Sequence, residues 1–362
     1  MTDRSAFPKP DQHIAGRSSI RFYILAAGLV LVCGFLLIVG IFGASIFRVM
    51  IPASHVTPDF AATIQSLISS QTLAPAFSSP TLTASVGGPN GHIVITCQIF
   101  QYQVSEQICI MNADGTNYHR LTTDDGIRHF YPSLAPDGKS VVYSGFNPLT
   151  QHFDIYEYDL ETGMTRDLTN SFGDLNGPEI SPDLKTIVFT RYFTDINHPT
   201  LWLMDRNGAN FRQVSDISAW DPTWSPDGKQ ILFASDKNGS DQLYIVNLNG
   251  SNLRMVSNLP ALRGRSDWSA QNLIATYSGN PWEREIFIMN PDGSNLQQIS
   301  PKGGNSQGPS FSPDGQWIAF TAYFDKFNDI NGCEIYIMRV DGTNLRRLTN
   351  NDYCDYQPRW GP

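Results

Sequence analysis

Short runs of β-branched and aromatic residues recur from about residue 89 onward, and each run is bounded by Pro, Asp and Gly. The clearest unit is segment 221–229, Asp-Pro-Thr-Trp-Ser-Pro-Asp-Gly-Lys, followed by the apolar segment 231–233. Related units place their first proline, or a serine in its position, at Pro132, Pro178, Pro222, Ser266, Pro309 and Pro358. A turn glycine gives a second series: Gly115, Gly163, Gly208, Gly250, Gly293 and Gly342. Both series advance by 42 to 49 residues, which predicts a repeat protein.

Each repeat is predicted to form four antiparallel strands. The first carries a Pro-x-Trp/Phe-Ser pattern, and the Pro-Asp-Gly after it favours a tight turn, because Pro presets φ and Gly tolerates positive φ. The second and third are apolar, as in 318–320 (Ile-Ala-Phe) and 334–338 (Glu-Ile-Tyr-Ile-Met). An Asp-Gly or Asn-Gly turn, typical of a β-hairpin, leads to a fourth strand such as 345–349 (Leu-Arg-Arg-Leu-Thr). This pattern is typical of one blade of a β-propeller.

The two ends of the repeat region complement each other. The first set of strands, 92–122, has no inner strand before it, and the last inner strand, around Pro358, has no further strands after it. Joining them completes one blade and removes the exposed edges of an open ring. We therefore predict an all-β, six-bladed propeller over residues 89–362, in which residues 358–360 supply the inner strand of blade 1.

A different segment precedes the repeats. Residues 22–47 contain no charged side chain. This uncharged segment is long enough to span a bilayer and is longer than the apolar core of an ordinary signal peptide. Four basic residues precede it, so residues 1–21 are predicted to be a cytoplasmic tail and the bulk of the chain extracytoplasmic. Residues 48–88, rich in Ser, Thr, Ala and Pro, are predicted to be a stalk. A cleaved signal, or a lipoprotein modified at Cys33, remains an alternative to this signal anchor.

The amino-acid composition limits the classes of molecule that the protein is expected to bind. Charged residues make up 16% of the chain, the formal net charge is −9, and no run of basic residues is present. Nucleic-acid binding is therefore disfavoured. The 41% of hydrophobic residues is sufficient for a sizeable core.

The repeats resemble those of the TolB-like, or WD40-like, β-propeller family. The resemblance rests on the Pro-x-Trp-Ser-Pro-Asp-Gly-Lys stretch, the Ile-Tyr-Ile-Met strand, and the segment Asp-Gly-Thr-Asn-Leu-Arg-Arg-Leu-Thr at 341–349. It implies a propeller of the bacterial cell envelope. The family's namesake is a soluble periplasmic protein with an α/β domain before its propeller, where this chain has the predicted anchor and stalk. Similar propellers precede the hydrolase domain of some peptidases, and no such domain is expected after this one.

No catalytic motif is evident, and neither a cofactor nor a metal ion is expected. The sequence lacks Gly-x-Ser-x-Gly, His-Glu-x-x-His, Cys-x-x-Cys and a phosphate-binding glycine loop. His129 and His198 fall in predicted loops, either as solvated residues or as ligands across the channel. The aspartates of the first turn are interpreted as hydrogen-bonding the local backbone rather than binding calcium. They are Asp137, Asp183, Asp227 and Asp314.

Four cysteines follow the predicted anchor. Cys97 ends a second strand and Cys109 opens the third strand of the same blade, while Cys333 and Cys354 lie at one end of blade 6. Three pairings are possible, and the local one, 97–109 with 333–354, is our prediction. It fits an oxidising compartment. Four reduced, buried thiols are the alternative.

In a propeller, the loops that join the second to the third strand and those that join neighbouring blades share one face. We call it the loop face. Aromatic and charged side chains on it suit partner recognition, although such aromatics can also pack against their own loops. The candidate partner-binding residues are Phe146, Phe153, Tyr192, Phe193, Asp221, Arg263, Arg265, Tyr323 and Phe324.

Three functional hypotheses follow. The first is a membrane-anchored, extracytoplasmic and monomeric propeller that binds a protein or peptide as a scaffold or sensor of the cell envelope. The second is a hydrolase or lyase that acts on carbohydrate at the channel mouth. The third is a structural envelope protein without a specific ligand. We predict the first, and an enzyme is not expected.

Overall fold

The computed structural model describes residues 88–99, 106–124, 127–170, 172–192, 198–324 and 332–362. The predicted tail, anchor and stalk, residues 1–87, lie outside them, as does Phe193. No helix in these described ranges is long and apolar enough to cross a bilayer.

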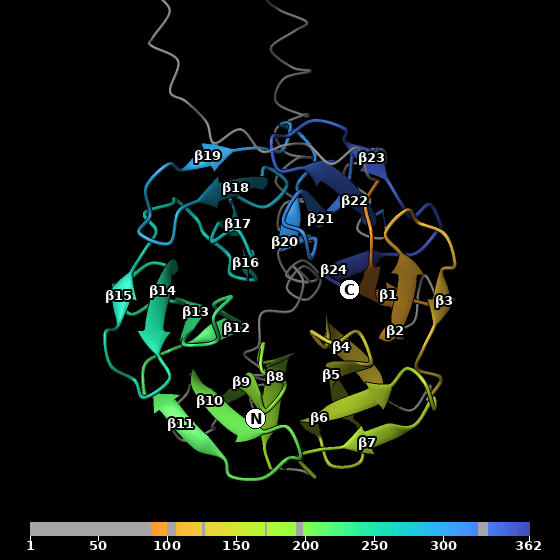
Figure 1. Cartoon of the computed structure of the whole chain (residues 1–362), viewed down its shortest axis with the longest axis vertical. Coiled ribbons are helices and arrows are strands. Elements are labelled where there is room, and N and C mark those ends of the chain that lie inside the picture. The colour runs from red at the N-terminus through yellow and green to blue at the C-terminus, as the bar shows by residue number, and fades with distance from the viewer. Residues whose placement is uncertain (1–87, 100–105, 125–126, 171, 193–197, 325–331) are drawn as a thin grey trace, which may run out of the picture. The chain divides into compact units, whose positions relative to one another are not determined.

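Six four-stranded antiparallel sheets surround a central axis (Figure 1). Blade 1 contains β24 (Asp355–Gly361), β1 (His92–Gln98), β2 (Glu106–Asn112) and β3 (His119–Arg120). Blade 2 contains β4 (Arg128–Leu134), β5 (Ser140–Asn147), β6 (His152–Asp159) and β7 (Thr165–Asp167). Blade 3 contains β8 (Asp174–Ile180), β9 (Thr186–Tyr192), β10 (Pro199–Asp205) and β11 (Arg212–Ser215).

The remaining three blades follow the same order from the axis outward. Blade 4 contains β12 (Trp220–Trp224), β13 (Gln230–Ser235), β14 (Gln242–Asn247) and β15 (Arg254–Met255). Blade 5 contains β16 (Asp267–Trp268), β17 (Ile274–Ser278), β18 (Glu285–Met289) and β19 (Gln297–Gln298). Blade 6 contains β20 (Gln307–Phe311), β21 (Trp317–Ala322), β22 (Glu334–Arg339) and β23 (Arg346–Arg347). The predicted six blades and the closure of blade 1 by the C-terminal strand are confirmed.

The core lies between the blades. Each of the six interfaces between neighbouring blades contains an apolar cluster of described residues. In β13, Ile231 and Phe233 pack toward blade 3, whereas Leu232 and Ala234 pack toward blade 5. Because successive side chains of a strand point to opposite faces, both faces of a middle strand are buried and its sequence is continuously apolar.

In blades 2, 3, 4 and 6, an aspartate holds the turn between the first and second strands. Oδ1 of Asp227 accepts hydrogen bonds from the Ser225 hydroxyl (2.7 Å) and the Lys229 backbone N–H (3.1 Å). These bonds hold the pKa of Asp227 below its usual range, the Ser225 hydroxyl being the largest cause. Asp137, Asp183 and Asp314 accept the equivalent backbone bond at 3.0–3.2 Å. The predicted local role of these aspartates is confirmed.

The turn glycine between the third and fourth strands has a second role, at the interface between blades. Gly250 has φ of +81°, and a Cβ there would lie 2.6 Å from the carbonyl oxygen of Val214 in blade 3. Gly208, Gly293 and Gly342 approach the preceding blade in the same way. At these four glycines the turn therefore combines a positive φ with a close approach of two backbones.

An arginine of the outer strand makes a related contact with the next blade. In β11, Nη1 of Arg212 donates to the carbonyl of Leu248 in the turn of blade 4 (2.8 Å). In β15, Nη1 of Arg254 donates to the carbonyl of Pro291 in the turn of blade 5 (2.8 Å). The arginine at this position of the outer strand thus joins blade 3 to blade 4 and blade 4 to blade 5.

Both predicted disulfides are present. Cys97 and Cys109 join β1 to β2 within blade 1, with their Cα atoms 5.9 Å apart. Cys333 and Cys354, with Cα atoms 4.7 Å apart, lie directly before β22 and β24. The second disulfide therefore connects blade 6 to the strand that closes blade 1.

Candidate functional site

The inner strands share a conformation that is unusual for a strand. At the residue before the repeat proline, φ is positive in every blade: Tyr131, Gly177, Asp221, Arg265, Gly308 and Gln357. The register of the inner strand shifts at this point, as between Trp220 and Thr223 in β12. Such a bulge re-aims a side chain. Four of these six residues, Tyr131, Gly177, Asp221 and Arg265, line one pocket.

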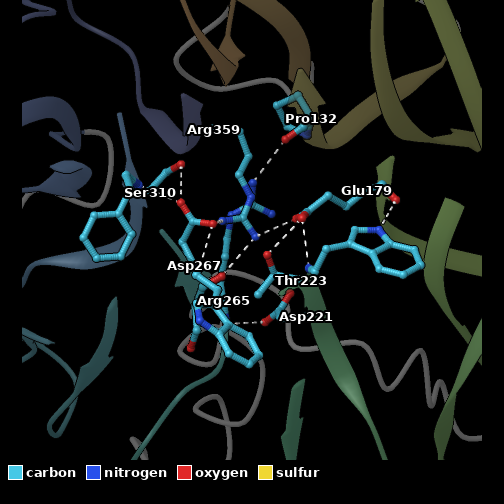
Figure 2. A network of polar contacts seen from close by, with 12 residues as sticks. Pro132, Glu179, Asp221, Thr223, Arg265, Asp267, Ser310 and Arg359 are labelled. Carbon is cyan, nitrogen blue, oxygen red and sulfur yellow. Dashed lines mark hydrogen bonds and ion pairs between the residues drawn. The ribbon is translucent and has the colours of Figure 1, made fainter. Parts of the chain in front are cut away.

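The residue after the repeat proline differs from blade to blade, and in five blades it joins a polar network at the axis (Figure 2). Oε1 of Glu179 in blade 3 accepts from the Thr223 hydroxyl (2.9 Å) and the Trp224 N–H (3.1 Å) of blade 4. Oδ2 of Asp267 in blade 5 accepts from the Ser310 hydroxyl of blade 6 (3.0 Å) and from the next backbone N–H. Each carboxylate therefore joins the inner strands of two neighbouring blades.

Arg359 of β24 lies between these two carboxylates, as Figure 2 shows. Its Nη2 is 3.5 Å from Oε2 of Glu179, and its Nη1 is 3.4 Å from Oδ1 of Asp267. Nη2 also donates to the carbonyl of Ser266 (3.1 Å). The guanidinium thus connects blade 1 to blades 3 and 5.

Arg265 spans the axis in another direction. Its Nη2 donates to the carbonyls of Pro132 in blade 2 (3.3 Å) and Gln357 in blade 1 (3.1 Å). Its backbone N–H donates to Oδ2 of Asp221 in blade 4 (2.9 Å), and its guanidinium lies 5.4 Å from the centre of the Tyr131 ring. One side chain therefore links blade 5 to the two blades across the channel.

The network contains two guanidinium groups and three carboxylates. Burial raises the pKa of Glu179, and Arg359 opposes this shift. Burial also raises the pKa of Asp221, where Arg265 opposes it, and lowers the pKa of Arg265 to about 10. Buried charges are costly unless they are paired with opposite charges or hydrogen-bonded, and here other residues of the same chain provide these partners. The arrangement is suited to holding the ring together and to presenting a fixed polar surface.

A small polar pocket opens within this network. The empty space amounts to about 220 Å³, part of it open to solvent. Its lining residues are Tyr131, Pro132, Gly177, Pro178, Glu179, Asp221, Pro222, Arg265 and Arg359. Asp221 and Arg265, candidate loop-face residues in the sequence, are thus brought together in the channel.

Sequence analysis missed Glu179, Asp267 and Arg359. One signal could have found them. The position after the repeat proline holds a small hydroxyl residue in three blades and a charged residue in the other three. A charge at a position that repeats otherwise fill with Ser or Thr is a reason to expect an ion pair across the axis.

The predicted loop-face aromatics are half-buried and form several separate contacts. Phe146 and Phe153 oppose each other across β5 and β6, with ring centres 5.0 Å apart. Tyr323 meets Trp282 edge to face at 5.1 Å. Phe324 meets Tyr336 at 5.2 Å. Tyr192 ends β9, opposite Pro199, and Arg263 is half-buried just before β16.

The same face carries a residue that sequence analysis did not consider. Leu149, in the loop between β5 and β6, is 92% exposed, the largest value among the large hydrophobic residues that the structure describes. Its loop is ordered by hydrogen bonds to Asn147: the Leu149 N–H donates to Oδ1 (2.9 Å), and the Gln151 N–H donates to the carbonyl (2.8 Å). A leucine in a Pro-Leu-Thr-Gln turn is the available sequence signal.

The two candidate histidines have unrelated environments. His129 was predicted in a loop, which is wrong: it lies in β4, 3% exposed, because the inner strand of blade 2 begins earlier than its proline suggests. A ring nitrogen of His198 lies 3.0 Å from the carbonyl of Asp216. Across the described residues, no group of three or more His, Cys, Asp or Glu side chains could hold a metal ion.

His129 makes the stability of the propeller sensitive to acid. Within the described part of the chain neither ring nitrogen has a hydrogen-bond partner, and the ring packs edge-on against Tyr143 at 5.0 Å. Burial lowers its pKa to about 4. A histidine that titrates near 6.5 when unfolded then binds more protons in the unfolded state between these two values, so stability falls as the pH falls.

We expect this histidine to cost about 2 kcal/mol of stability between pH 7 and pH 5. Urea unfolding of the wild type and of His129→Phe at both pH values measures it. The comparison between proteins is needed because burial raises the pKa of Asp355 to about 7, which favours the folded state on acidification. An equal pH dependence of the two proteins would contradict the prediction.

Six antiparallel four-stranded blades around a polar channel define a β-propeller. The chain belongs to the TolB beta propeller domain family, whose model matches residues 80–323.

Several proteins share this similarity in sequence. The Tol-Pal system protein TolB of Francisella tularensis is 23% identical over 267 residues, 71% of this chain and 59% of that protein. An uncharacterised protein of Agrobacterium fabrum is 24% identical over 243 residues, 65% of this chain and 68% of that protein. An uncharacterised peptidase of Bacillus subtilis is 27% identical over 157 residues, 33% of this chain. The chain matches only 24% of the length of that peptidase.

Solved structures show the same fold. TolB from Acinetobacter baumannii superposes with a TM-score of 0.65 at 24% identity, covering 75% of this chain and 67% of that one. A putative TolB from Agrobacterium tumefaciens gives a TM-score of 0.58 at 18% identity, covering 76% of this chain and 100% of that one. At these identities the similarity concerns the fold.

Proposed function

We propose that this chain is a protein- or peptide-binding scaffold or sensor of the cell envelope and that its partner docks on the loop face. The observation that carries the proposal is Leu149, an apolar side chain left 92% exposed on an ordered turn of that face. Burial of a leucine contributes about 1.5–3 kcal/mol. Because the turn is already ordered, little conformational entropy is lost on docking.

The surroundings of Leu149 add to this proposal. Phe146 lies near the end of β5 and Phe153 near the start of β6, on either side of the loop that carries Leu149. The ring centres of Phe130 and Phe153 are 6.0 Å apart. An exposed apolar residue in a loop flanked by aromatic residues suits a protein interface, in which a few buried side chains supply most of the affinity.

The location is part of the same proposal. We propose that residues 22–47 anchor the chain in the membrane and that a monomeric propeller lies on the extracytoplasmic side. Two disulfides in the propeller support an oxidising compartment. The Francisella tularensis relative is a Tol-Pal system protein, which is consistent with an envelope role for this fold.

The carbohydrate hydrolase or lyase of the sequence analysis has less support. Such an enzyme needs two carboxyl groups free to face a substrate. Glu179 and Asp267 each accept hydrogen bonds from a neighbouring blade and each pair with Arg359. Asp221 accepts from the backbone of Arg265. These partnerships favour a scaffold.

Site-specific photocrosslinking tests the scaffold. The full chain, in the envelope of its own organism, carries a photoreactive phenylalanine analogue in place of Leu149 or, as the control, of Met164. Met164 is 70% exposed and follows β6 at the end opposite to the Leu149 loop. We expect a discrete adduct from position 149 and none from position 164.

A second measurement tests whether binding of the captured partner depends on the Leu149 side chain. Leu149→Ser is expected to weaken binding of the captured partner by about tenfold or more, and Met164→Ser to leave it unchanged. Adducts from both positions, or from neither, would contradict docking on the loop face.

A further inference from the structure

Ring closure depends on one strand, β24. Its backbone pairs with β1 of blade 1, from Gly361 opposite His92 to Asp355 opposite Cys97. The other five blades are each built from four consecutive strands, so among the described strands β24 is the one that joins the C-terminal end of the chain to the first blade. We propose that the Cys333–Cys354 disulfide is a redox latch that holds β24 in the ring.

The disulfide is placed where it can act on this strand. Cys354 directly precedes β24, and Cys333 directly precedes β22 in blade 6. Backbone bonds reinforce the junction: the Asp355 N–H donates to the Cys333 carbonyl (2.9 Å), and the Gln98 N–H donates to the Cys354 carbonyl (3.0 Å). The bond thus fixes the start of β24 to blade 6 at the seam between the last blade and the first.

Release of β24 from the ring would also disrupt contacts at the central channel. The Gln357 N–H donates to the Thr321 hydroxyl (3.2 Å), and the Trp360 N–H donates to the Ser310 hydroxyl (3.0 Å), both in blade 6. Between them lies Arg359, whose ion pairs connect blades 1, 3 and 5. The oxidation state of one disulfide is therefore linked, through a single strand, to the polar network at the axis.

The second disulfide is a natural control. Cys97 and Cys109 lie on neighbouring strands of the same blade, β1 and β2, which are already paired along their length. This bond crosses no seam. Cys97 and Cys109 are 0% and 2% exposed, and Cys333 is 0% exposed, whereas Cys354 is 7% exposed. Cys354 is thus the least buried of the four residues, and we place the attack of an external thiolate at its Sγ.

The chemistry is thiol–disulfide exchange with an external dithiol. One thiolate of the dithiol attacks Sγ of Cys354, which forms a mixed disulfide and releases the Cys333 thiolate. The second thiolate of the dithiol then displaces Cys354. The dithiol becomes a disulfide, and the two cysteines gain two electrons and two protons, so that two thiols remain.

Hydrogen exchange measured by mass spectrometry on the full chain tests the latch. We compare the wild type, Cys333→Ser/Cys354→Ser, and the matched control Cys97→Ser/Cys109→Ser. Loss of the latch is expected to speed exchange in peptides of β24 by about tenfold or more, with β13 and β14, the middle strands of blade 4, unchanged. In the control, faster exchange should be confined to β1 and β2. Equal protection of β24 in all three proteins would overturn the proposal.

Graded reduction of the wild type by dithiothreitol covers the case in which the double variant does not fold. Thiols are trapped with N-ethylmaleimide and located by peptide mass. Cys333 and Cys354 are expected to be labelled first, and exchange in β24 should rise with the fraction labelled. Prior labelling of Cys97 and Cys109, or labelling of Cys354 without faster exchange in β24, would contradict the latch.

Discussion

Replacement of Arg359 by methionine is expected to destabilise the propeller by about 3–5 kcal/mol, because removal of one partner leaves a buried charge uncompensated. Here two carboxylates lose their partner at once. Glu179 and Asp267 both pair with this guanidinium, at 3.5 and 3.4 Å. Equilibrium unfolding in urea, followed by tryptophan fluorescence, measures the loss.

Two further variants separate the ion pairs from loss of a long side chain. Arg212→Met removes an exposed arginine that makes one hydrogen bond to Leu248, and it should cost about 1 kcal/mol. Adding Glu179→Gln and Asp267→Asn to Arg359→Met removes the uncompensated charges and should restore part of the stability. A cost for Arg359→Met no greater than that for Arg212→Met would show that the network does not hold the ring.

Gly250→Ala is expected to cost about 3 kcal/mol. About 1 kcal/mol arises because alanine disfavours the positive φ of +81°. The remainder arises because the new Cβ would lie 2.6 Å from the Val214 carbonyl oxygen, so blades 3 and 4 must move apart. Urea unfolding of the variant and of the wild type gives the difference.

Gly163→Ala is the matched control. Gly163 occupies the equivalent turn of blade 2 with φ of +70°, yet the nearest atom to its Cβ would be the Tyr158 hydroxyl oxygen at 3.5 Å. This variant should show only the cost of about 1 kcal/mol for the backbone conformation. Equal losses at the two glycines would mean that the approach between blades contributes nothing to stability.

The predictions from sequence were correct for features that depend on interactions within one repeat. Turns depend on the conformational preferences of three or four consecutive residues, and so Pro-Asp-Gly and Asn-Gly marked the hairpins correctly. The disulfide pairing was also predictable, because the propeller topology brings the ends of neighbouring strands together. The hydrogen bonds of Asp227 show that a role inferred from recurrence in four turns was local.

The contacts of side chains at the axis could not be predicted from the sequence. Arg265 contacts Pro132, 133 residues away, and Gln357, 92 residues away. No local pattern identifies such partners, since they depend on the direction in which each bulge turns a side chain and on the width of the closed ring. His129 shows the same limit: a polar residue before a repeat proline suggested a loop, and packing against Tyr143 placed it in a strand.

By itself, the sequence determined six blades, closure by the last strand and two disulfides, because hairpin turns and a regular period are encoded by neighbouring residues. Only the tertiary structure decided which charged residues meet. Ring closure brings inner strands from all six blades to one axis, and there the cost of burying a charge selects partners that are far apart in the chain.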